Sequence, residues 1–162
     1  MKNTIKIGIA DMNIAKGEDE LVTFALGSCV AICLYDSERR IAGMAHIMLP
    51  DSKLMANSAS QPLKFADTAL LELLKAMQQS GARSALLWAK IAGGAQMFAE
   101  TTNSPLGNIG GRNTQAVKEG LARFRIPIIA EDTGKNYGRT CYFDAATGTM
   151  LIKSALKGEW RF

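Results

Sequence analysis

Short apolar stretches alternating with polar positions dominate the pattern of this chain. Ile5, Ile7 and Ile9 alternate with Lys6 and Gly8, which is the two-residue period of a half-buried strand. Other stretches are rich in β-branched residues, too short for ordinary helices, and bounded by polar turns or by Gly and Pro. We therefore expect about eight strands, over residues 5–9, 21–26, 30–35, 41–49, 84–91, 126–131, 139–144 and 149–153.

Two segments instead carry apolar residues at helical spacing. In the first, Pro62 suits a first helical turn and Gly81 supplies a stop. The second is expected to begin at about Asn113 or Thr114, either of which can cap a helix, and to end before Pro127. The apolar positions that predict these two helices are Leu63, Ala66, Leu70, Leu73, Leu74 and Met77, and then Val117, Leu121 and Phe124.

The order of these elements predicts an α/β fold. Strands come first, strands and helices then mix, and strands close the chain, which favours a layered sandwich of two packed mixed β-sheets with helices on one side. A chain of 162 residues can bury a core without disulfides or metal. We expect residues 1–162 to form a single domain without a linker.

Composition and charge narrow the function classes. The chain is 48% hydrophobic and 21% charged, as ordinary globular proteins are. Its net charge of +4 comes from scattered basic residues, which could favour an acidic partner but more often form a solvated surface. Aromatic residues make up 7% and form no stacking motif, so we expect no nucleic-acid binding. No stretch has the apolar length of a signal peptide or a membrane span, and we expect a cytoplasmic protein without membrane insertion.

The cysteines are expected to stay reduced. Three is an odd number, and Cys29 and Cys33 would lie roughly 13 Å apart along a strand, too far for a disulfide. Cys33 and Cys141 are interpreted as small buried hydrophobic residues. Cys29 differs because it follows Gly27 and Ser28, where the backbone can expose a side chain and direct N–H groups at an oxyanion.

Cys29 and the only histidine, His46, form the strongest candidate for chemistry. A thiol becomes a strong nucleophile as its thiolate, and a neighbouring imidazole is the usual base. The Thr23 hydroxyl is the nearby group that could fix the imidazole tautomer, and the backbone N–H groups of Ser28 and Cys29 are candidate oxyanion donors. The pattern predicts a cysteine hydrolase.

Other interpretations of these residues stay open. In an extended strand, Ala42, Met44, His46 and Met48 share one face, so His46 could be a core histidine bound to a carbonyl. If Gly27 and Ser28 made a plain two-residue hairpin turn, Thr23 would point away from Cys29, unless the turn is irregular or bulged or Thr23 acts through its backbone.

Metal or anion binding is a rival use of the same segments. A tetrahedral metal site of the three cysteines and His46 is conceivable, but the chain has no close C-x-x-C pair, and we expect no metal. The glycine clusters at 93–95 and 107–113 lack the endings of phosphate-binding loops and indicate structural turns. The second cluster precedes a helix, whose N-terminus could meet an anion or a substrate carboxamide.

Several ordered motifs resemble those of one known family. The segments LGSCVAICLYD, GMAHIMLP, KIAGGAQMF, NIGGRN and GRTCYFDAATGTMLIK are similar to the chemoreceptor glutamine deamidase family, CheD, over residues 22–153. The resemblance implies Cys29 as nucleophile, His46 as base and Thr23 as third member, acting through a thioester without a cofactor. It also implies a fold related to the catalytic domain of cytotoxic necrotizing factor toxins.

The same resemblance implies substrates and partners. The family deamidates glutamine side chains on the cytoplasmic helices of bacterial chemoreceptors, and some members hydrolyse glutamyl methyl esters or bind the phosphatase CheC. A rival hypothesis is a binding module that keeps the fold without catalysis. The intact set of Thr23, Cys29 and His46 favours the enzyme.

Overall fold

The computed structural model of this chain describes residues 1–97 and 107–162, which form ten strands and two α-helices. Neither α-helix has the length and apolar character needed to cross a bilayer, and the same holds for every other helix in these ranges. The elements are β1 Thr4–Ile7, β2 Asp11–Lys16, β3 Glu20–Leu26, β4 Val30–Asp36, β5 Ile41–Ile47, α1 Ala66–Gln79, β6 Trp88–Gly93, α2 Ile109–Arg123, β7 Ile128–Thr133, β8 Arg139–Asp144, β9 Met150–Ser154 and β10 Gly158–Arg161.

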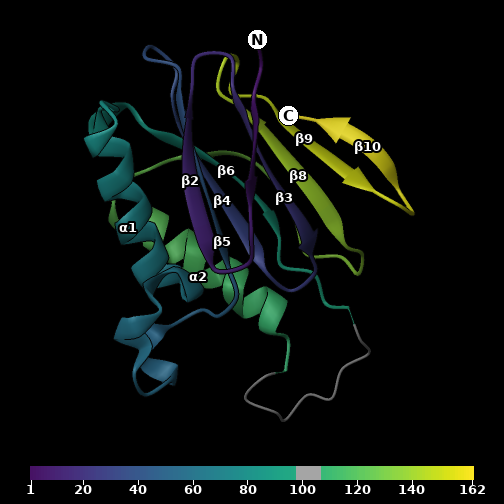
Figure 1. Cartoon of the computed structure of the whole chain (residues 1–162). Coiled ribbons are helices and arrows are strands. Elements are labelled where there is room, and N and C mark those ends of the chain that lie inside the picture. The colour runs from purple at the N-terminus through teal and green to yellow at the C-terminus, as the bar shows by residue number, and fades with distance from the viewer. Residues whose placement is uncertain (98–106) are drawn as a thin grey trace.

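The strands form two five-stranded sheets that pack against each other. The first has the order β1-β3-β8-β9-β10 and the second β2-β5-β4-β6-β7. Each sheet is mixed, because β1 and β3 run parallel in the first and β6 and β7 run parallel in the second. Helices α1 and α2 both cover the outer face of the second sheet (Figure 1). The predicted α/β sandwich with helices on one side is confirmed.

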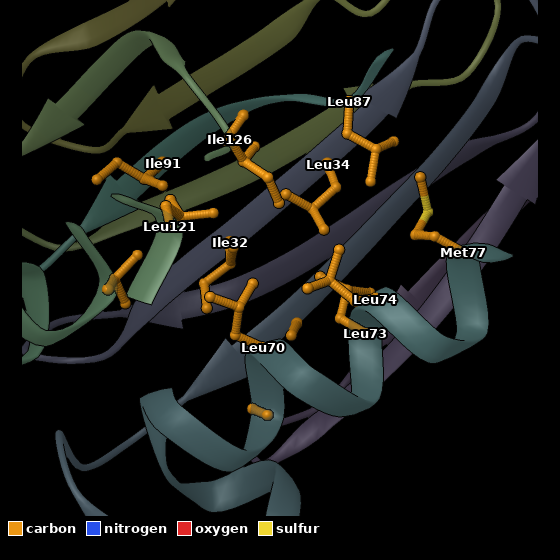
Figure 2. Close-up of a cluster of buried hydrophobic side chains, with 14 of the residues drawn as sticks. Ile32, Leu34, Leu70, Leu73, Leu74, Met77, Leu87, Ile91, Leu121 and Ile126 are labelled. Atoms are coloured by element: carbon orange, nitrogen blue, oxygen red, sulfur yellow. The ribbon is translucent and has the colours of Figure 1, made fainter. Parts of the chain in front are cut away.

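Two buried layers lie on either side of the second sheet. The helix-side core fills the space between that sheet and the helices, as Figure 2 shows for residues of α1, β4 and their neighbours. The inter-sheet layer fills the space between the two sheets. Its buried residues are Ile7, Ala15, Leu21, Leu26, Ala31, Cys33, Tyr35, Ala42, Met44, Ala92, Cys141, Phe143, Ala145, Met150 and Ile152.

Strand β5 contributes to both layers because successive side chains of a strand point to opposite faces. Ala45 and Ile47 belong to the helix-side core, whereas Ala42 and Met44 belong to the inter-sheet layer. The predicted alternation is confirmed, and it places His46, two residues after Met44, on the inter-sheet face.

Several predicted strand boundaries are wrong. The strand predicted over 5–9 ends at Ile7, and Ile9 lies in a turn with 54% of its surface exposed. Strand β6 begins only at Trp88, after a short 3-10 turn at Ser84–Leu86. The strand predicted over 126–131 lies at Ile128–Thr133. Strands β2 and β10 were not predicted, because both are short, largely polar and at sheet edges, where little apolar surface is buried.

The helix boundaries also differ from the prediction. Pro62 opens a separate 3-10 turn, Pro62–Lys64, and α1 starts later, at Ala66. Helix α2 starts at Ile109 behind the cap Asn108, so Asn113 lies inside the helix and does not cap it. A Cβ on Gly110 would lie 2.3 Å from the carbonyl oxygen of Ala95, so close packing requires glycine there and overrides its poor helix propensity.

Candidate active site

His46 lies near the end of β5, an interior strand of the second sheet. Strand β5 pairs with β2 on one side and β4 on the other, where Asp11 and Ala31 stand opposite His46. The side chain is fully buried in the inter-sheet layer. A histidine in this position depends on specific polar partners from the facing sheet, because its side chain has no exposed surface in the resting structure.

Thr23 supplies that partner from β3 of the other sheet. Its Oγ1 lies 2.6 Å from Nδ1 of His46 and donates to the carbonyl oxygen of Ile7 at 2.8 Å. A hydroxyl has one hydrogen and a carbonyl oxygen can only accept, so the Thr23 hydrogen is committed to Ile7. Nδ1 of His46 must then donate to Thr23. In the neutral imidazole this leaves Nε2 without a hydrogen and able to accept a proton.

Thr23 faces the inter-sheet layer by regular alternation with Leu21, and a β-bulge after it brings Leu26 to the same face before the chain reaches Cys29. Thr23 pairs with Cys141 and Leu26 with Arg139, so β3 has one residue more than β8 between these pairs. Ala25, inside the bulge, has φ +59. Strands β3 and β4 belong to different sheets, so residues 27 and 28 cross between sheets and do not form a hairpin turn. Of the alternatives left open by the sequence, the irregular, bulged connection is the one observed.

Cys29 stands directly before β4 and is half-buried. It precedes Ala31 by two residues, and Ala31 is paired with His46. Cys29 and His46 are therefore diagonal neighbours on one sheet face, a relation with Cα atoms about 7–8 Å apart. Cys29 packs against the inter-sheet layer, in agreement with this placement. Nε2 of His46 has no hydrogen-bond partner among the described residues, so the contact from Nε2 to the thiol is not formed here.

Burial favours the neutral forms of both groups. It lowers the pKa of His46 from 6.5 to about 4. It also raises the pKa of the Cys29 thiol, and the backbone N–H of Cys29 only partly opposes this. The resting pair is therefore a thiol and a neutral imidazole, and a proton has to move when the sulfur attacks.

Two glycines allow the backbone to pack closely around Cys29. Gly94 donates its N–H to the carbonyl oxygen of Cys29 at 2.8 Å. A Cβ on Gly93, whose φ is +109, would lie 2.2 Å from that same oxygen. The interpretation of the glycine cluster at 93–95 as structural is supported. These glycines allow close packing against the backbone of Cys29.

Asn113 is a neighbour of the site that the sequence analysis treated only as a helix cap. Its buried Nδ2 donates to the carbonyl oxygens of Ser28 and Met48, both at 2.9 Å. Asn113 is the last residue of the NIGGRN motif, but this motif does not reveal hydrogen-bond partners so far away in the sequence.

The other two cysteines lie deeper in the inter-sheet layer. Cys33 and Cys141 are fully buried, as predicted, and none of the three cysteines forms a disulfide. Within residues 1–97 and 107–162, no group of three or more His, Cys, Asp or Glu side chains is arranged to hold a metal ion.

Comparison with known proteins points to one family. The family model described as CheD chemotactic sensory transduction matches residues 48–154. The probable chemoreceptor glutamine deamidase CheD of Lachnoclostridium phytofermentans is 49% identical over 159 residues, 98% of each chain. Proteins of the same description from Syntrophomonas wolfei and Clostridium botulinum strain Eklund 17B are 47% and 49% identical, over 98% and 94% of each chain. The first two matches span nearly the whole chain and so include the segment with Thr23, Cys29 and His46.

Proposed function

Because the chain belongs to the CheD family, we propose that it hydrolyses glutamine side chains of chemoreceptors to glutamate, with release of ammonia. One observation carries the proposal. The Thr23 hydroxyl binds Nδ1 of a buried His46, whose Nε2 has no partner among residues 1–97 and 107–162 and faces the layer against which Cys29 packs. Such an arrangement suits a base for a thiol nucleophile.

In the first half-reaction, Nε2 of His46 takes the proton of the Cys29 thiol as the sulfur attacks the carboxamide carbon. The carbonyl oxygen becomes an oxyanion in the tetrahedral intermediate. The backbone N–H of Cys29, with that of Ser28, is the proposed donor to this oxygen. When the intermediate collapses, the C–N bond breaks, His46 returns the proton to nitrogen, and ammonia leaves a thioester on Cys29.

In the second half-reaction, neutral His46 takes a proton from a water molecule that attacks the thioester carbon. A second tetrahedral intermediate forms and collapses by breaking the C–S bond. His46 then protonates the departing sulfur, and glutamate is released. The balance is glutamine plus water to glutamate plus ammonia, and His46 and Cys29 end in their starting forms.

Mass spectrometry on a receptor substrate tests this proposal. The purified protein is incubated with a chemoreceptor cytoplasmic fragment, and peptides are searched for the mass change from side-chain amide to acid. We expect conversion at glutamine, with matching ammonia release, and none with Cys29→Ala. Cys33→Ala is the matched control, because it removes a fully buried thiol from the same layer, whereas the Cys29 thiol is half-buried and can meet a substrate. A wild type that binds receptor without converting glutamine would refute the proposal.

The finer features of the family follow as part of the same proposal. They are a single deamidase domain over residues 1–162, relation of the two-sheet fold to the catalytic domain of cytotoxic necrotizing factor toxins, action on receptor helices in the cytoplasm, and a CheC-type phosphatase as partner. The coverage of 98% of both chains by the first relative supports the domain extent. Co-purification with a CheC-type protein from the same organism tests the partner.

A further inference from the structure

The amide of Asn113 joins the two segments that carry Cys29 and His46. Its Nδ2 donates to the carbonyl oxygen of Ser28, the residue before Cys29, and to that of Met48, two residues after His46. A primary amide nitrogen has two hydrogens, and both are used. The amide orientation is therefore fixed, because Oδ1 in the same place would face two carbonyl oxygens. Asn113 is fully buried, and its Oδ1 has no partner among the described residues.

The bond to Ser28 determines where the N–H of Cys29 points. The Ser28 carbonyl and the Cys29 N–H belong to one planar trans peptide, so they point in opposite directions. When Asn113 holds the carbonyl, the N–H is directed to the opposite side, away from the amide. A small rotation of this peptide would move donor and carbonyl together.

The segment that follows β6 does not accept a hydrogen bond from the N–H of Cys29. Gly94 donates to the carbonyl oxygen of Cys29, and a regular antiparallel ladder would return a bond from the Cys29 N–H to Gly94. Gly94 has φ +64, and its carbonyl oxygen lies beside α2, 2.6 Å from where a Cβ of Gly110 would be. The return bond is not formed, and within the described part of the chain no backbone carbonyl accepts from the Cys29 N–H.

We propose that Asn113 is a positioning residue for the oxyanion site: it fixes the Ser28–Cys29 peptide so that the free N–H of Cys29 meets the carbonyl oxygen of the substrate. The inference rests on the proposed function and adds a residue to it. The N–H of the nucleophilic residue itself is a donor that acyl-transfer sites use. The second bond, to Met48, holds the end of β5 at a constant distance from Cys29.

Two reactions of the same thiol separate positioning from a general structural role. Deamidation passes through an oxyanion, whereas alkylation by iodoacetamide displaces iodide at a saturated carbon and forms none. For Asn113→Ala we expect kcat for deamidation to fall roughly 10–100-fold, somewhat less than the loss typical of a deleted oxyanion donor. We expect the rate of Cys29 alkylation to stay near that of wild type. Cys33 and Cys141 are buried and should react slowly. Peptide mapping shows which cysteine carries the label.

Two further variants complete the experiment. Gln115→Ala removes an exposed amide from the same helix and should keep the wild-type kcat. If Asn113→Ala shows no cooperative thermal unfolding, Asn113→Ser takes its place, because a hydroxyl can still donate to one carbonyl. It should show a smaller loss of kcat, again with unchanged alkylation.

The outcomes distinguish this inference from the proposed function. A wild-type kcat in the folded Asn113 variant overturns the inference alone. An equal fall of deamidation and alkylation also overturns it, because the amide would then place the whole Cys29 segment without directing its N–H. A wild type that produces no glutamate overturns the proposed function, and the inference with it.

Discussion

The two buried layers on either side of the second sheet differ in chemistry. The buried side chains of the helix-side core are aliphatic or Met, such as Leu73 and Met77 of α1 and Ile32 of β4 (Figure 2). The layer between the sheets also buries His46 with its partner Thr23. The helix-side core therefore stabilises the second sheet, whereas the inter-sheet layer contains the reactive side chains.

Strands make this division possible because their side chains alternate between faces. In β5, the apolar residue Ile47 belongs to the helix-side core, while its neighbour His46 meets Thr23 in the other layer. The facing sheet offers His46 a polar partner, Thr23, at a fixed position, whereas the opposite face of β5 meets the apolar side chains of α1. The same backbone can therefore be anchored firmly on one face and carry a proton-transfer group on the other.

Replacing the base should give the largest effect in the inter-sheet layer. His46→Gln removes proton transfer and should lower kcat about 10²–10⁴-fold while receptor binding is retained. Steady-state ammonia release and a separate binding measurement check this. Substantial deamidation by this variant would show that the layer contains another base and would remove the contrast between the two layers.

Truncation in the helix-side core should affect stability and leave chemistry intact. Leu73 is fully buried there, and Leu73→Ala should lower the free energy of unfolding by about 3–4 kcal/mol. The kcat per folded molecule should not change. Leu71→Ala, on the same helix but 42% exposed, is the matched control for urea unfolding. A large loss of kcat in Leu73→Ala would mean that the two layers are not separable.

Acid should destabilise the protein through the buried imidazole. Burial lowers the pKa of His46 from 6.5 to about 4, so between these values the unfolded chain binds a proton that the folded chain does not. Stability is therefore lost as the pH falls through this window, by on the order of 3 kcal/mol. Urea unfolding at neutral and acidic pH should show that the free energy of unfolding falls more for wild type than for His46→Gln. An equal fall in the two proteins would refute the lowered pKa of His46.

The smallest effect is expected from the group that orients the base. Thr23→Val keeps the shape but removes the hydroxyl between Ile7 and His46, and should lower kcat roughly 10–100-fold, as loss of a group that orients a histidine does. Thr23→Ser retains the hydroxyl and should restore most of the rate. If valine and serine variants were equally active, the hydrogen bond to Nδ1 would have no role in orienting His46.

Much of the scaffold was predictable because burial leaves a local pattern. The alternation predicted through 41–49 gave β5 and its two faces, although the strand ends at Ile47, and the spacing from Leu70 to Met77 predicted the buried side of α1. The local sequence pattern did not predict β2, where little is buried, or the start of α2, where close packing at Gly110 overrides helix propensity.

The sequence by itself determined which reactive groups exist: a single histidine, a cysteine after Gly27 and Ser28, and a threonine close by. Only the tertiary structure decided how they meet, because β3 and β4 lie in different sheets, and the packing of these sheets brings Thr23 against His46. The same holds for Asn113, which binds a carbonyl 85 positions away. Hydrogen bonds of this kind depend on how distant segments of the chain pack together, and a local pattern of apolar residues does not determine that packing.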